Sequence, residues 1–125
     1  SGLSQETLFR LQSDAIRKAA EESPCVFVGR CADYVLREHK NIVTIFITAD
    51  IEERIANIQK RHNCSPEEAK KIITNKEDTR SSYYNYYTGK TWGSSASYDL
   101  CVNSSRLGLE GTKKYIADFI RKVKK

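Results

Sequence analysis

Three short apolar segments, each typical of a buried β-strand, alternate along this chain with longer helical segments. They cover residues 25–29, 42–48 and 98–103. The middle segment is almost continuously apolar and β-branched, which is typical of a strand covered on both faces. This alternation predicts βαβ units with right-handed crossovers, and therefore an α/β fold with a parallel sheet and flanking helices. An average sheet has about five or six strands, so we expect further strands N-terminal to these.

Local signals mark where the helical segments begin and end. Ser4 is a suitable N-cap for a first helix that Pro24 ends. Ser65-Pro66-Glu67-Glu68 has the form of a capping box with Pro at the first helical position. The predicted helices cover residues 4–22, 33–39, 51–62 and 66–87, and a last helix begins near residue 109.

The composition is typical of a globular protein, since 39% of the 125 residues are hydrophobic and 30% are charged. We expect a single domain over residues 1–125. No apolar run approaches the roughly 20 residues of a membrane helix, and no signal peptide is visible. We therefore expect a cytoplasmic protein without a membrane partner. The chain starts with Ser1-Gly2 instead of Met, so we expect the natural protein to extend further.

The formal net charge of +5 would suit a polyphosphate or nucleic-acid partner. A solvated basic face explains it more simply, because much of the excess lies in residues 121–125. The four cysteines form no C-x-x-C pair and complete no zinc pattern with the two histidines, so we predict no metal site. Cys25 and Cys101 lie within apolar segments, where we expect them to be buried and free of disulfides.

Candidate ligand contacts follow the apolar segments, because ligands of open α/β sheets bind beyond the carboxyl ends of the strands. The first segment ends in Gly29-Arg30, where Gly allows a sharp turn and the Arg guanidinium can grip a phosphate. A structural turn with an exposed Arg explains this dipeptide equally well. The other two segments are followed by polar residues, which are Thr48, Asp50, Asn103, Ser104 and Ser105.

Residues 54–80 carry many charges on two predicted amphipathic helices, joined near His62-Asn63. Such a pair could form a lid that brings cationic groups to a phosphoryl group. A solvent-facing hairpin with internal ion pairs accounts for the same pattern. The aromatic cluster Tyr83-Tyr84-Asn85-Tyr86-Tyr87, followed by Trp92, could stack on a base or pack beneath the loop.

Taken together, these segments resemble the cytidylate kinase-like family of P-loop nucleotide kinases over roughly residues 8–120. The motifs that carry the resemblance are Val26-Phe27-Val28-Gly29-Arg30-Cys31-Ala32-Asp33-Tyr34-Val35-Leu36, Ile45-Phe46-Ile47-Thr48-Ala49 with Glu53-Arg54, Glu77-Asp78-Thr79-Arg80 with Tyr83-Tyr84, Tyr86-Tyr87-Thr88-Gly89-Lys90-Thr91-Trp92-Gly93, and Tyr98-Asp99-Leu100-Cys101-Val102-Asn103-Ser104-Ser105. The resemblance implies a P-loop kinase-like parallel sheet with flanking helices and a helical lid at about 54–80, truncated at the N-terminus.

The resemblance also implies an activity, in which the γ-phosphoryl group of ATP moves, with Mg²⁺, to a nucleoside monophosphate. The implied substrate-binding residues are Arg30, Asp33, Glu77, Asp78 and Arg80, and the implied catalytic residues are Arg54 and Arg61. Arg30 would hold the acceptor phosphate, while the two lid arginines would neutralise charge in the transition state. The family has Asp directly after Gly-Arg, where this chain has Cys31, and this weakens the case for CMP as acceptor.

One motif of such kinases is missing from the chain, the Gly-x-x-x-x-Gly-Lys-Ser/Thr loop that holds the triphosphate. The chain's own motifs therefore bind neither ATP nor Mg²⁺, and we expect the chain alone to be inactive although the full-length protein would be a kinase. The alternatives are a non-catalytic domain that binds a nucleotide, another phosphoryl ligand or RNA, and a structural interaction module. A sheet lacking a strand should form a homo-oligomer or associate with the missing N-terminal segment.

Overall fold

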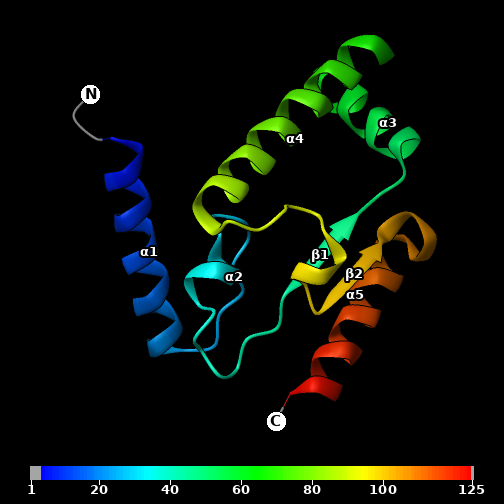
Figure 1. The fold of residues 1–125 in the computed structure, drawn as a ribbon. Helices are drawn as coiled ribbons and strands as arrows, with labels where there is room; N and C mark the ends of the chain where they lie inside the picture. The colour runs from blue at the N-terminus through cyan, green and yellow to red at the C-terminus, as the bar shows by residue number, and fades with distance from the viewer. Residues whose placement is uncertain (1–3, 125) are drawn as a thin grey trace. The chain divides into compact units, whose positions relative to one another are not determined.

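The computed structural model describes residues 4–124, which form two compact units divided between Ile42 and Val43 (Figure 1). Within the described residues the fold is a mostly helical α/β arrangement, with five α-helices and a two-stranded parallel sheet. The α/β class and the parallel sheet are confirmed, but the sheet has one strand fewer than the sequence predicts. Between residues 4 and 124, no helix is both long enough and apolar enough to cross a bilayer.

The first unit contains α1 (Gln5–Glu22) and the short α2 (Ala32–Val35). Ser4 caps α1 as predicted, because its side chain accepts a hydrogen bond of 3.1 Å from the backbone N–H of Thr7. Helix α2 is shorter than the predicted helix 33–39. Its inward side chains, Ala32 and Val35, are buried in this unit.

The predicted strand 25–29 is wrong, because residues 24–28 have no regular secondary structure and belong to no sheet among the described residues. Val26 and Val28 are 93% and 90% exposed. A strand forms only where a second strand pairs with its backbone groups, and sequence propensity cannot supply that partner. Residues 24–28 therefore have the composition of a strand but no strand that pairs with them.

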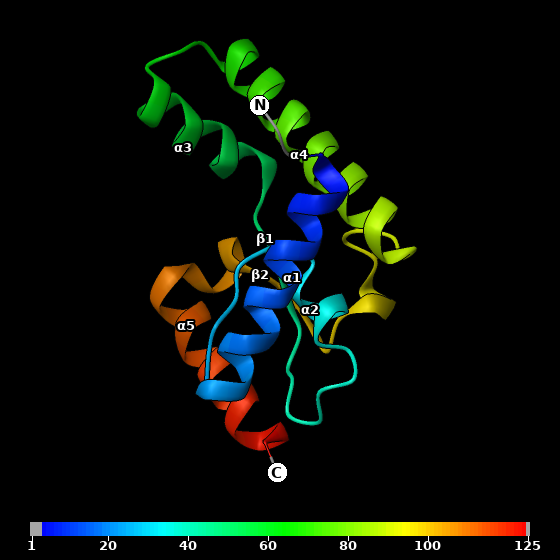
Figure 2. The same ribbon diagram turned by 90° about the vertical axis from the view of Figure 1, so that its left-hand side faces the viewer.

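The second unit is built on β1 (Ile45–Thr48) and β2 (Leu100–Asn103), which pair in parallel from Ile45↔Leu100 to Thr48↔Asn103. Helix α5 (Ser104–Val123) packs against both strands, and Figure 2 shows it beside the sheet. Gly108 interrupts α5 with a non-helical φ of 73°, so the regular part starts at the predicted residue 109. The predicted two-sided cover of the middle strand is wrong, since Ile47 is 54% exposed.

Helices α3 (Ile51–His62) and α4 (Pro66–Thr88) form an antiparallel hairpin within the same unit (Figures 1 and 2). Asn63 closes α3 in the left-handed conformation, and the predicted capping box opens α4. Glu68 N–H donates to Ser65 Oγ, and Ser65 N–H donates to Glu68 Oε1, both at 3.1 Å. These hydrogen bonds from Ser65 hold the pKa of the Glu68 carboxyl below its ordinary value. The predicted two-helix geometry of residues 54–80 is thus confirmed.

The cysteines differ from expectation, because Cys25 and Cys101 are exposed and Cys31 is buried. The two cysteines expected in the core are exposed because residues 24–28 form no strand and because β2 leaves Cys101 uncovered. Burial, and then the negative charge of Asp33, raise the pKa of Cys31 to about 11.

We predict that iodoacetamide modifies Cys25 and Cys101 of the native chain quickly at pH 8, and Cys31 at least about 100-fold more slowly. A rise of two pKa units alone removes about 99% of the reactive thiolate, and burial adds to the protection. Peptide mass spectrometry over a labelling time course measures the three rates. Equal rates for Cys31 and Cys25 would contradict the buried position of Cys31, and the same reaction in denaturant serves as control.

Candidate functional site

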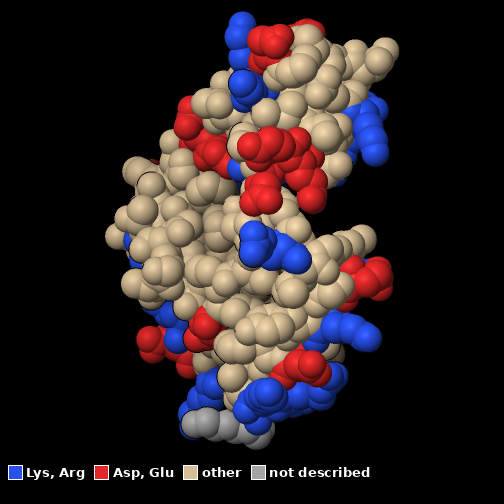
Figure 3. Space-filling model, turned by 90° about the vertical axis from the view of Figure 1, so that its right-hand side faces the viewer, with Lys and Arg blue, Asp and Glu red and all other residues tan. Residues whose placement is uncertain are grey.

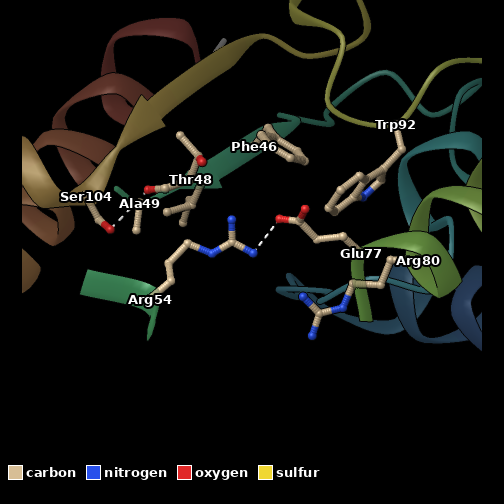
Figure 4. A pocket seen from close by; sticks show the side chains of 9 residues that line it. Phe46, Thr48, Ala49, Arg54, Glu77, Arg80, Trp92 and Ser104 are labelled. Atoms are coloured by element: carbon tan, nitrogen blue, oxygen red, sulfur yellow. Dashed lines mark hydrogen bonds and ion pairs between the residues drawn. The ribbon is translucent and has the colours of Figure 1, made fainter. Parts of the chain in front are cut away.

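A pocket of about 200 Å³ lies at the carboxyl end of β1, within the second unit (Figure 4). Strand β1 and the residue after it provide the floor, α3 and α4 provide charged groups, and the loop before β2 provides an aromatic ring. The lining residues are Phe46, Ile47, Thr48, Ala49, Arg54, Glu77, Arg80, Trp92 and Ser104. Thr48 and Ser104, two of the polar residues that follow the strands, line this pocket, and their role as ligand contacts stays a prediction.

Hydrogen bonds between the two strand ends fix this floor. Ser104 Oγ donates to the Thr48 carbonyl at 3.1 Å, and the backbone N–H of Asp50 donates to Ser105 Oγ at 2.9 Å. Asn103 Nδ2 donates to Asp50 Oδ1 at 2.9 Å, so the Asp50 carboxylate joins the strand ends instead of capping α3. The polar residues after the strands therefore act first as a scaffold for the pocket.

Two arginines and one carboxylate supply the charge of the pocket. Arg54 of α3 forms an ion pair with Glu77 of α4, and their side chains are only 30% and 38% exposed. Figure 4 shows the Arg54 guanidinium reaching toward the Glu77 carboxylate, with the Trp92 ring beside the Glu77 side chain. Arg80 lies one turn after Glu77 on α4, and none of the described residues forms an ion pair with it. The pocket thus has one paired and one unpaired guanidinium.

Aromatic rings form one wall of the pocket. The Phe46 and Trp92 rings meet edge to face with centroids 5.1 Å apart, and Tyr98 packs on Phe46 at 5.0 Å. Trp92 is held by its backbone N–H, which donates to Asn85 Oδ1 at 2.7 Å. A Cβ at Gly93 would meet the Phe46 ring at 3.4 Å, which is an ordinary contact, and it is the φ of 79° that favours glycine at this position. Sequence reasoning missed Phe46 as a site residue, because its apolar segment gave no signal beyond strand propensity.

The structure brings together three of the predicted site residues, Arg54, Glu77 and Arg80. Arg61 is exposed in the last turn of α3, seven residues and so roughly 10 Å along the helix from Arg54. Asp78 is exposed on α4 and does not line this pocket. The roles predicted for these five residues stay predictions.

Arg30 and Asp33 belong to the first unit. Gly29, Arg30 and Cys31 have φ values of 71°, 56° and 58°, so three successive residues are left-handed. This conformation costs a non-glycine residue about 1–2 kcal/mol, and such strain is common at functional sites. Arg30 is exposed, and Asp33 Oδ1 accepts a hydrogen bond of 2.8 Å from the Tyr34 backbone N–H.

Charge on the rest of the second unit is mixed. In Figure 3, basic side chains gather toward the C-terminal end of α5, with acidic side chains among them. Two of the basic residues of α5 pair with acids one turn away, Lys113 with Glu110 and Arg121 with Asp118. Ion pairs of this kind are typical of a solvated helix face.

The residues Gly89-Lys90-Thr91 match the last part of a phosphate-binding loop, but their position does not fit that role. Gly89 is the C-cap of α4, with φ at 71°. A phosphate-binding loop needs the N-terminal end of a helix, where free N–H groups point at the anion. The C-terminal end of α4 presents carbonyl oxygens instead, so Gly89-Lys90-Thr91 ends the helix and does not form a phosphate-binding loop.

Comparison with known proteins identifies the chain's relatives. The family model described as the cytidylate kinase-like family matches residues 1–106. The crystal structure of an uncharacterized protein from Eubacterium ventriosum ATCC 27560 is similar, with a TM-score of 0.90 at 25% sequence identity. That match covers 97% of this chain and 69% of the other. A search of curated proteins found no match.

Proposed function

This chain belongs to the cytidylate kinase-like family, and we propose that it forms the acceptor-nucleotide side of a nucleotide phosphotransferase. The reaction would transfer the γ-phosphoryl group of ATP to a nucleoside monophosphate. The observation that carries this proposal is the combination of Arg54 and Arg80 with Phe46 and Trp92 around one pocket. Guanidinium groups bind phosphate in a fork geometry, and aromatic rings provide an apolar surface for a base or a sugar.

The proposed contacts divide between the residues as follows. Arg80 would bind the acceptor phosphate first, because its guanidinium lines the pocket without an ion pair to any described residue. Arg54 would neutralise the charge that develops on the transferred group. Arg30, Asp33, Arg61 and Asp78 keep the binding and catalytic roles that the family implies, as further parts of the proposal.

The residues of this chain do not fit a binding site for ATP and its metal ion. No Gly-x-x-x-x-Gly-Lys-Ser/Thr loop is present in the 125 residues. Residues 4–124 include no group of three His, Cys, Asp or Glu side chains placed to share a metal ion, and the Asp50 carboxylate is engaged by Asn103. The residues that hold ATP and Mg²⁺ in the proposed reaction would therefore have to come from outside these 125 residues. This observation also favours the second candidate function for the chain on its own, the binding of a nucleotide or another phosphoryl ligand without catalysis.

Trp92 is the only tryptophan of the chain and lines the pocket, so its fluorescence can report binding directly. We predict that CMP, AMP and inorganic pyrophosphate each change this fluorescence in a saturable way, and that the chain transfers no phosphoryl group from ATP by itself. Uridine without a phosphate is the control, and it should bind at least about tenfold more weakly, since a charge-assisted hydrogen bond contributes about 1.5–3 kcal/mol. Saturable binding of uridine with no response to any phosphate compound would overturn the proposal.

A further inference from the structure

The ion pair between Arg54 and Glu77 places a carboxylate inside the pocket where a phosphoryl group would bind. Arg54 Nη2 and Glu77 Oε2 are the two atoms in contact. A carboxylate and a phosphoryl group use the same guanidinium N–H groups in the same planar geometry. While Glu77 holds Arg54, those donors are not available to a ligand.

Building on the proposed function, we propose that Glu77 is an internal occupant of the phosphate subsite, which an incoming phosphate must displace from Arg54. Glu77 thereby sets the affinity of the pocket and favours ligands with enough negative charge to take both arginines. The family resemblance alone implies a different role for Glu77, that of a substrate-binding residue. In the structure, its carboxylate faces a protein guanidinium.

The Arg54–Glu77 ion pair is weak enough for a phosphate to displace Glu77. The two side chains are 30% and 38% exposed, and ion pairs of this exposure change an equilibrium by at most about fivefold. A phosphate dianion between Arg54 and Arg80 would form two charge-assisted contacts. Together these would stabilise the complex more than the single Arg54–Glu77 contact that they replace. Arg80, one helical turn from Glu77, provides the first contact while Arg54 is still paired.

Replacing the carboxylate by an amide tests this role, because Glu77→Gln keeps the size and shape of the side chain and removes its charge. We expect Glu77→Gln to bind inorganic pyrophosphate about fivefold more tightly than the unmodified chain, measured by Trp92 fluorescence. The thermal midpoint should stay the same or fall slightly, since one exposed ion pair is lost. A residue with a merely structural role would lower both the midpoint and the affinity.

Glu52→Gln is the matched control. Glu52 is exposed in the first turn of α3 and forms no ion pair with Arg54 among the described residues, so this substitution removes the same charge without changing the Arg54 pair. Its affinity for pyrophosphate should change less than about twofold. Equal or weaker binding by Glu77→Gln would overturn the inference, and so would an equal gain in both variants, which would reflect net charge alone. If pyrophosphate does not bind the unmodified chain in any measurable way, the proposed function fails first, and the two failures are therefore distinguishable.

Discussion

Replacing both Arg54 and Arg80 with Ala should weaken the binding of pyrophosphate and of nucleoside monophosphates by at least about 100-fold. Each arginine that pairs with a phosphate contributes about 1.5–3 kcal/mol, and a tenfold change in affinity corresponds to about 1.4 kcal/mol. The pocket has no other Lys or Arg among its lining residues. Titration of the Trp92 fluorescence in the double variant measures the loss.

The single variants separate the two roles. Arg80→Ala should cause the larger loss, because Arg80 forms no ion pair with any described residue, whereas Arg54 must first leave Glu77. Lys60→Ala on α3 and Lys70→Ala on α4 are matched controls, since both are exposed and neither lines the pocket. If all four single variants weaken binding equally, the effect comes from overall charge, and the pocket is not the phosphate site.

Local sequence signals predicted the helices well, because each signal acts within a few residues. The Ser65 box forms both of its hydrogen bonds, and α3 ends at His62 as expected. The start of the last helix at residue 109 also holds in the structure, where Gly108 breaks the helical geometry just before it. These features depend on neighbours along the chain, so a single sequence contains the information they need.

The candidate site was less accessible to prediction, because its residues are distant in sequence. Arg54 and Glu77 are on different helices, and they meet only because the Asn63 turn folds α3 back along α4. The family resemblance selected both residues but gave no reason for their contact. Phe46 and Trp92 were assigned to a strand and to an aromatic cluster, and only the strand pairing of β1 with β2 brings their rings together.

The predicted strand 25–29 also could not be judged from its own residues. Residues 25–28 have the composition of a strand, yet a β-ladder also requires a partner with free backbone groups at the right register. Such a partner can come from another part of a longer chain or from a second chain, and neither leaves a signal in these residues. Val26 and Val28 are exposed among the described residues, and they offer an apolar surface for such a partner.

We predict that this chain self-associates at micromolar concentration through that segment. Burying a Val side chain contributes about 1.5–3 kcal/mol, so two copies that cover Val26 and Val28 would gain about 6–12 kcal/mol before the cost of association. Micromolar affinity requires a net gain of about 8 kcal/mol after that cost, so further contacts must add to those of the two valines of each copy. The unpaired backbone of residues 24–28 adds hydrogen bonds when a second extended segment aligns with it.

Light scattering should therefore give a mass above that of one chain for the unmodified protein, and the mass of one chain for the Val26→Lys/Val28→Lys double variant. Two lysines at these positions place like charges across the contact, a device that natural edge strands use against pairing. Leu8→Lys/Leu11→Lys is the comparison, because these α1 side chains are also exposed, at 44% and 51%. If this second variant dissociates the protein and the first does not, the contact lies on α1. A monomeric unmodified chain would refute self-association altogether, and it would mean that Val26 and Val28 tolerate water without a partner.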